Sequence, residues 1–134
     1  MFFKERWFGF DDGLYAGARL LEILARTPDA NAALAALPDS TSTPELNLQM
    51  AEGEPFKLVD ALKRDAKFEG ARQIITIDGV RVEYADGFGL ARPSNTTPVV
   101  VLRFEADDAQ ALARIQADFR RAITAVWPGA AIPF

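Results

Sequence analysis

Residues 73–105 constrain the fold of this chain most strongly, because short segments of alternating apolar and polar side chains follow one another between tight turns. The alternation is cleanest over Val80–Tyr84, and Val99–Glu105 is the most apolar segment of the chain. Asp78-Gly79 is a dipeptide typical of hairpin turns. Since consecutive strands joined by short turns pair antiparallel, we expect an antiparallel sheet here. The expected strands cover residues 46–50, 73–77, 80–84, 88–92 and 99–105.

Two amphipathic helices flank these strands in the sequence. Pro55 suits the first turn of a helix that runs to about Phe68. Asp107 or Asp108 is expected to cap a second helix that ends near Val126, and residues 130–134 form an apolar tail that should pack back. Both helices should cover one face of the sheet. The fold class is therefore predicted as α+β, with an antiparallel sheet of about four strands and helices packed on one face.

Residues 1–38 have a different character. Residues 1–10 hold five of the 12 Phe and Trp residues, a composition that favours an interior strand of something larger. Asp11-Asp12-Gly13 should cap a helix over residues 14–26, and residues 29–37 are expected to form a short Ala-rich helix. The Pro-, Ser- and Thr-rich residues 39–44 read as a linker or hinge before a second unit at 45–134.

The polar stretch Arg92–Pro98 lies between two expected strands, Gly89–Ala91 and Val99–Phe104. It gathers a guanidinium, hydroxyls, a carboxamide and backbone N–H groups, which are the donors that hold a phosphate. Ser, Asn, Thr and Pro are also the ordinary residues of a hairpin loop. Composition therefore leaves two interpretations open, a phosphate site and a plain turn.

The composition excludes several classes of function. The net charge is −4, with 15 basic and 19 acidic residues, which argues against nucleic-acid binding and against an anionic membrane. The chain has no cysteine and no histidine, so disulfides, thiolate nucleophiles and the commonest general base are absent. No apolar run is long enough to span a bilayer and no signal peptide is apparent, so we expect a cytoplasmic protein.

Other charged residues have ordinary structural interpretations. Alternation places Arg81 and Glu83 on one sheet face, and Arg103 and Glu105 invite the same interpretation, so we expect cross-strand ion pairs there. Asp11 and Asp12 are expected to serve as a helix cap and not as metal ligands.

Three segments together resemble a known family. They are FFKERWFGFDDG at residues 2–13, DGVRVEYADGFGLARPSNTTPVVVLRFEA at 78–106 and the amphipathic helix that follows. In this order they are similar to the C-terminal end of the bacterial phosphomannomutase/phosphoglucomutase enzymes of the α-D-phosphohexomutase superfamily. The resemblance covers essentially the whole chain.

The resemblance implies a domain assignment and a site. Residues 1–38 would be the end of the sugar-binding third domain, 39–44 the hinge, and 45–134 the last domain, of TATA-box-binding-protein-like fold. In the family that domain grips the phosphate of a hexose 1- or 6-phosphate, the sugar that these isomerases interconvert through a phosphoserine and a bisphosphorylated intermediate. The gripping loop falls on Arg92, Ser94, Asn95 and Thr96, with Thr97 adjacent.

The departures from the family limit what this chain does alone. The phosphoserine loop, the Asp-rich Mg²⁺ loop and the sugar loop are missing, so the chain resembles a fragment and is expected to be inactive by itself. Mg²⁺ and the activator glucose 1,6-bisphosphate are implied only for the full-length enzyme, which would supply the missing N-terminal domains. The preference between glucose and mannose stays open without the sugar loop.

Two other functions remain as alternatives. One is a stand-alone, non-catalytic phosphate-binding or interaction module. The other is a nucleic-acid-binding sheet domain, which the acidic balance and the lack of aromatic residues interleaved with basic ones on the strands disfavour.

Overall fold

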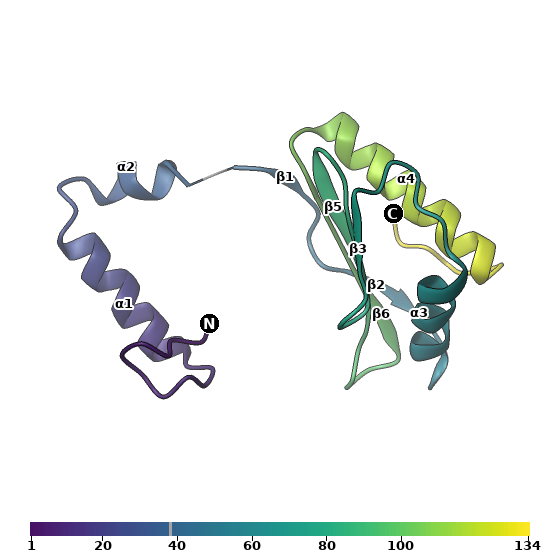
Figure 1. Ribbon diagram of the computed structural model, residues 1–134, viewed down its shortest axis with the longest axis horizontal. Helices are drawn as coiled ribbons and strands as arrows, with labels where there is room; N and C mark the ends of the chain where they lie inside the picture. Colours follow the sequence, from purple (N-terminus) through teal and green to yellow (C-terminus); the bar gives the residue numbers. More distant parts are fainter. Residues whose placement is uncertain (38) are drawn as a thin grey trace. The chain divides into compact units, whose positions relative to one another are not determined.

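A computed structural model describes residues 1–37 and 39–134, and the chain divides into two compact units, Met1–Asp39 and Ser40–Phe134. Helices α1 and α2 belong to the first unit, and a sheet with helices α3 and α4 forms the second (Figure 1). Pro38, the last residue of the predicted first domain, lies outside the described residues. Each unit is described separately below.

The first unit contains α1 (Gly13–Ala25) and α2 (Ala30–Ala35), close to the two predicted helices. Each begins at an aspartate cap. Asp12 accepts a hydrogen bond from the backbone N–H of Tyr15 at 2.9 Å, and Asp29 accepts one from Ala32 at 3.0 Å. A carboxylate in this position satisfies one of the free N–H groups of the first turn and also faces the positive end of the helix dipole.

The aromatic segment at residues 1–10 does not form the predicted strand. Its only ladder contact in the described structure is a single bridge between Phe2 and Asp11. The rings gather instead, and Trp7 stacks on Tyr15 with their centroids 4.4 Å apart. A strand requires a neighbour to satisfy its backbone N–H and C=O groups, and the described part of this unit offers none.

The second unit contains a six-stranded sheet in which every strand pair is antiparallel. Its strands are β1 (Thr41–Ser42), β2 (Leu46–Gln49), β3 (Gln73–Ile75), β4 (Val80–Glu83), β5 (Gly87–Pro93) and β6 (Val99–Ala106). The sheet has more strands than the predicted four or so, in part because β1 forms within the segment predicted as a linker and pairs, like β2, with one edge of the long β6. The α+β class with an antiparallel sheet is confirmed.

The register separates a core face from an open face. Val80 pairs with Ala91 and Ala91 with Leu102, and all three side chains are fully buried. Gly89 lies on the same face, where a Cβ atom would collide with the ring of Phe119, so the sheet needs glycine at this position. Positions one residue along from the buried ones turn toward the other face.

Helices α3 (Glu54–Asp65) and α4 (Ala109–Val126) cover the core face, as predicted (Figure 1). Asp108 caps α4 by accepting a hydrogen bond from Ala111 at 2.8 Å. The C-terminal tail also packs back, with the ring of Phe134 against that of Phe104 at 4.8 Å. The largest fully buried side chains are Phe104, Phe119, Leu48, Leu58, Leu62, Leu102, Ile115 and Ile123.

One polar contact lies inside this core. The Tyr84 hydroxyl donates to the carboxylate of Asp118 at 2.6 Å, and Asp118 is only 4% exposed. Arg121, one turn further along α4, forms an ion pair with the same carboxylate. The buried charge is therefore paired and hydrogen-bonded, as such groups must be to avoid a large desolvation penalty.

The predicted linker at residues 39–44 is partly sheet. Thr41 and Ser42 form β1, and Thr43 donates its backbone N–H to the carbonyl of Phe104 at 3.0 Å. The boundary between the two compact units falls between Asp39 and Ser40.

Candidate phosphate site

Arg92 lies on β5 itself, two residues before the turn. The sequence placed Arg92 at the junction of an expected strand and the polar stretch, and the ladder continues past it: Arg92 pairs with Val101 and Pro93 with Val100. The side chain of Arg92 projects from the open face, since its neighbour Ala91 faces the core. A strand holds a guanidinium in place more firmly than a free loop does.

The turn itself is Ser94–Pro98, and its internal hydrogen bonds converge on the side chain of Ser94. The backbone N–H groups of Thr96 and Thr97 each donate to Ser94 Oγ at 3.3 Å. Ser94 Oγ also lies 3.0 Å from Thr97 Oγ1 and 3.4 Å from Thr96 Oγ1. These contacts fold the turn around one hydroxyl, a local arrangement that serine and threonine favour.

The rest of the molecule holds this turn at its base. Ser94 donates its backbone N–H to the carbonyl of Val99 at 3.0 Å, which closes the hairpin. Met50, after β2, donates its backbone N–H to the carbonyl of Pro98, also at 3.0 Å. The turn is therefore tied to both of its own strands and to the edge strand beside them.

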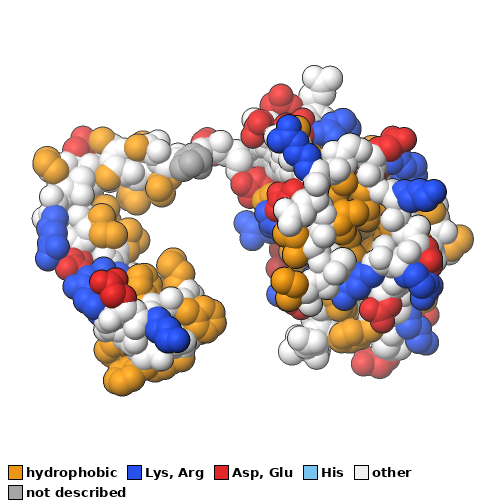
Figure 2. Space-filling model, viewed as in Figure 1, with side chains coloured by type: hydrophobic (Ala, Val, Ile, Leu, Met, Phe, Trp, Pro, Cys, Tyr) orange, Lys and Arg blue, Asp and Glu red, His pale blue; other side chains and the backbone are white. Residues whose placement is uncertain are grey.

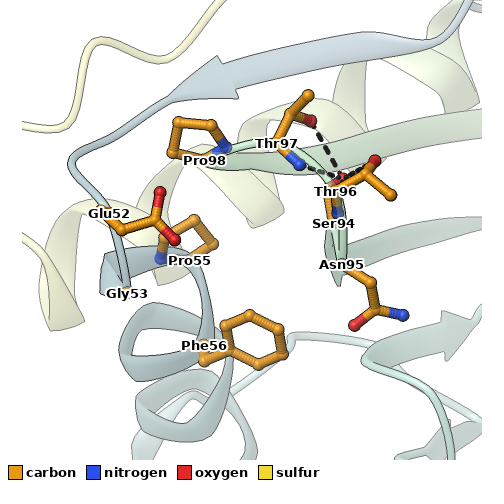
Figure 3. Close-up of a pocket in the computed structure, with 9 residues that line it drawn as sticks. All are labelled: Glu52, Gly53, Pro55, Phe56, Ser94, Asn95, Thr96, Thr97 and Pro98. Carbon is orange, nitrogen blue, oxygen red and sulfur yellow. Dashed lines mark hydrogen bonds between the residues drawn. The ribbon is translucent and has the colours of Figure 1, made fainter.

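Two hollows meet at the turn. One lies between the turn and the start of α3, and Figure 3 shows Ser94, Asn95, Thr96 and Thr97 on one side of it. The opposite wall comes from Glu52, Gly53, Pro55 and Phe56. This first hollow includes Asn95 and does not include Arg92.

The second hollow is a groove of about 520 Å³ on the open face of the sheet. Arg92, Ser94, Thr96 and Thr97 line it. Asn47 and Gln49 line its other side from β2, because they alternate with core residues along that strand. Of the five predicted site residues, the groove gathers four, and Asn95 lies on the α3 side.

The groove offers hydrogen-bond donors suited to an oxyanion. A guanidinium presents a planar fork of N–H groups that matches two oxygens of a phosphate. The hydroxyls of the turn can rotate to donate to further oxygens. In the free chain Arg92 forms an ion pair with Asp78 at 3.4 Å, and that carboxylate belongs to the turn between β3 and β4.

Sequence analysis did not single out Asn47, Gln49 or Asp78 as site residues. The alternation of β2 already placed Asn47 and Gln49 away from the core. The hairpin dipeptide identified the turn that holds Asp78. No local pattern indicated that either segment lies beside Arg92, because pairing of distant strands creates that proximity.

The ion pairs predicted across the strands are not the ones that form. Arg81 pairs with Glu83 on its own strand at 2.6 Å, and its guanidinium lies over the ring of Phe88 at 3.5 Å. Across the ladder, Arg103 faces Leu90 and Glu105 faces Phe88. The register therefore sets charged residues of β6 opposite apolar ones of β5.

Within 1–37 and 39–134, no three acidic, histidine or cysteine side chains lie close enough together to hold a metal ion. The described residues therefore offer no group of ligands for the Mg²⁺ that the resemblance implies for the full-length enzyme. Over the same ranges, no helix is both long and apolar enough to cross a lipid bilayer.

An antiparallel sheet with helices on one face and a hydroxyl-rich turn beside an arginine defines a small α+β domain with a candidate anion site. The family model of the phosphoglucomutase/phosphomannomutase C-terminal domain matches residues 45–122 of this chain. The chain belongs to this family.

Individual relatives agree with the family model. A phosphoglucomutase of Neisseria meningitidis is 58% identical over 133 residues, which cover 96% of this chain. A phosphomannomutase/phosphoglucomutase of Pseudomonas aeruginosa is 52% identical over 135 residues, which cover all of it. In each case the match spans 29% of the relative's own length.

A solved structure is also similar. The crystal structure of a phosphoglucomutase/phosphomannomutase family protein from Burkholderia thailandensis is 66% identical and superposes with a TM-score of 0.89. That match covers 99% of this chain and 28% of the other. The chain thus corresponds to the C-terminal portion of longer mutases.

Proposed function

We propose that Arg92, Ser94, Asn95, Thr96 and Thr97 bind the phosphate group of a phosphosugar. The observation that carries the proposal is the groove in which Arg92 and three hydroxyls of the Ser94–Pro98 turn face the same space. Asn95 lies at the same turn but lines the hollow toward α3 (Figure 3), and it is included because the family resemblance assigns it to the same loop. Family membership points to the same chemistry.

Binding by this chain alone should be weak. One charge-assisted contact to an arginine contributes roughly 1.5–3 kcal/mol, and each neutral hydrogen bond about 0.5–1.5 kcal/mol. Lost translational and side-chain freedom offsets much of that sum. The hydroxyls must also exchange the hydrogen bonds that they make to one another. We expect a Kd for phosphate or glucose 1-phosphate on the order of millimolar or weaker.

For the longer protein to which this domain would belong, we propose the activity that its relatives' names state. That protein would be a cytoplasmic phosphohexomutase that interconverts the 1- and 6-phosphates of glucose or mannose, with Mg²⁺ and the phosphoserine supplied by other domains. This domain would contribute the grip on the phosphate. Of the predicted hinge at residues 39–44, Asp39 and Ser40 precede β1 and would let the domain open and close, so that the bisphosphorylated intermediate can turn over between the two transfers.

The experiment is a titration of the ¹⁵N-labelled chain with inorganic phosphate and with glucose 1-phosphate, followed by amide shifts. The amide signals of Arg92 and of residues 94–97 should shift with a common, saturable dependence on ligand, and Pro93 has no amide proton to follow. Arg92→Ala should abolish the response, because it removes the only guanidinium that lines the groove within the described residues. Arg103→Ala is the matched control, since it removes an exposed arginine from the same sheet face.

Two results would count against the proposal. One is no shift at 92–97 at tens of millimolar ligand, and the other is equal binding by wild type and Arg92→Ala. A mutase assay of the chain with glucose 1,6-bisphosphate and Mg²⁺ tests the alternative of a self-sufficient enzyme. We expect no turnover, because phosphoryl transfer depends on a positioned nucleophile and metal that this chain lacks.

A further inference from the structure

We infer that the carboxylate of Asp78 competes with phosphate for Arg92. Asp78 pairs with the guanidinium when the site is empty and thereby weakens the binding of phosphate by this domain. The inference rests on the proposed function, because it concerns how strongly the same site binds. It assigns a role to a residue outside the Arg92–Thr97 segment. The argument starts from what lies on either side of Arg92.

Arg92 is shared between two hollows. The groove toward β2 contains the hydroxyls of Ser94, Thr96 and Thr97. A second hollow, of about 210 Å³, lies toward β3 and is lined by Ile75, Ile77, Asp78, Arg81, Leu90 and Arg92. Arg92 belongs to both, so its guanidinium can contact the carboxylate on one side or a ligand on the other.

The turn that carries Asp78 is held firmly against β5. Gly79 has a φ of +114°, and a Cβ atom there would lie 2.5 Å from the carbonyl oxygen of Ala91. Only glycine permits so close an approach of the two backbones. The neighbouring pair Val80–Ala91 belongs to the sheet ladder and is fully buried. The position of Asp78 beside Arg92 is therefore fixed by the backbone.

The contact itself is easily exchanged. It is a single contact from Nη1 of Arg92 to Asp78 at 3.4 Å, and the two side chains are 47% and 75% exposed. Exposed ion pairs of this kind contribute little. A phosphate dianion can form two parallel hydrogen bonds to the same guanidinium and adds the hydroxyls of the turn. Phosphate should therefore displace Asp78, but against a fixed negative charge that also repels it.

A site that must release its ligand in every catalytic cycle benefits from such a competitor. The carboxylate takes over Arg92 as phosphate leaves, so the guanidinium is not left without a partner. This favours release without removing any group that binds the ligand. The same residue would then lower the affinity of the domain and shorten the lifetime of its complex.

The test compares Asp78→Asn with Asp86→Asn in the 134-residue chain, titrated with inorganic phosphate by NMR. Asp78→Asn should preserve the fold, because Asn-Gly is as good a hairpin dipeptide as Asp-Gly. It should lower the Kd by about two- to fivefold, the factor that corresponds to loss of one exposed ion pair. Asp86→Asn should leave the Kd unchanged.

Asp86 is a matched control for charge. Its carboxylate also pairs with an exposed arginine, Arg114, at 2.5 Å. It lies just before the opposite end of β5, so its loss changes the net charge equally but not the local field at Arg92. A second measurement without ligand follows the Nε–Hε signal of Arg92. That signal should move in Asp78→Asn, stay in place in Asp86→Asn, and return toward its wild-type position in Asp78→Glu.

The outcomes separate the two ideas. If wild type binds through Arg92 but Asp78→Asn binds equally or more weakly, Asp78 is not a competitor and the phosphate site stands. An Arg92 Nε–Hε signal whose chemical shift is the same in Asp78→Asn as in wild type would also overturn the inference. If Arg92→Ala binds phosphate as well as wild type does, the proposed site itself fails. Absence of binding in every variant would remove both.

Discussion

Both units of this chain contain helices that begin at an aspartate cap, but their interiors are very different. In the first unit, Asp12 and Asp29 cap their helices, and Asp108 does the same for α4 in the second. Yet none of the described residues of the first unit is buried, while the second contains a continuous core. A cap therefore specifies where a helix begins and contributes little to whether a domain has an interior.

The apolar residues of the first unit are exposed for a simple reason. Figure 2 shows hydrophobic side chains spread over its surface, and Phe8, Leu14 and Leu21 are 81%, 88% and 67% exposed. Two short helices present too little surface to enclose their own apolar faces. Exposed apolar surface of this kind is typical of a face that another structure covers.

The largest expected effect comes from opening the core of the second unit. Phe119 is fully buried against Phe104 and Phe68, so Phe119→Ala should lower the free energy of unfolding by about 3–5 kcal/mol. Phe8→Ala, in the first unit, should change it by less than about 0.5 kcal/mol. Urea unfolding followed by circular dichroism measures both. Equal losses would show that the aromatic cluster of the first unit stabilises the chain as a core does.

The second prediction concerns alkaline pH. Burial, together with the hydrogen bond to Asp118, raises the pKa of Tyr84 far above its ordinary value. Above about pH 10 the unfolded chain loses this proton and the folded chain keeps it. The folded state therefore loses stability as pH rises, by about 1.4 kcal/mol per pH unit from this group.

Tyr84→Phe should remove that component of the pH dependence. Between about pH 9 and pH 12, the free energy of unfolding should fall less steeply with pH in this variant than in wild type. The difference between the two slopes should correspond to roughly one proton per molecule. Tyr15→Phe is the control, because Tyr15 lies in the first unit and its hydroxyl contacts only the backbone of Arg6 among the described residues. Identical slopes in wild type and Tyr84→Phe would show that the buried hydroxyl titrates as freely as an exposed one.

The smallest expected effect distinguishes the helix cap of the second unit from a cap of the first. Asp108→Ala should lower the free energy of unfolding of the second unit by about 1 kcal/mol, because the first turn of α4 loses its acceptor. Asp29→Ala removes a cap of the same type and should leave that unfolding transition unchanged, since α2 is not part of the sheet unit. Thermal unfolding of both variants measures the two effects. A shift from Asp29→Ala would show that the two units unfold together.

Much of the fold was accessible from sequence because it depends on neighbouring residues. Apolar spacing predicted α1, α3 and α4 to within a few residues, and Asp12 and Asp108 marked two of the starts. The Asp78-Gly79 turn and the antiparallel pairing of β3 through β6 followed from hairpin chemistry. The pairing of β1 and β2 with β6 was harder to predict, because it joins residues fifty or more positions apart in the chain.

The residue types alone specify the chemistry of the candidate site, which consists of one guanidinium and a short run of hydroxyls and amides. How these groups are presented depends on the folded chain. Strand pairing continued β5 through Arg92, and β2 brought Asn47 and Gln49 to the groove. It also set Asp78 beside Arg92, 14 residues away in the chain. The reason is physical: residue types fix which hydrogen bonds a group can make, but only long-range backbone pairing fixes which partners are near enough to make them.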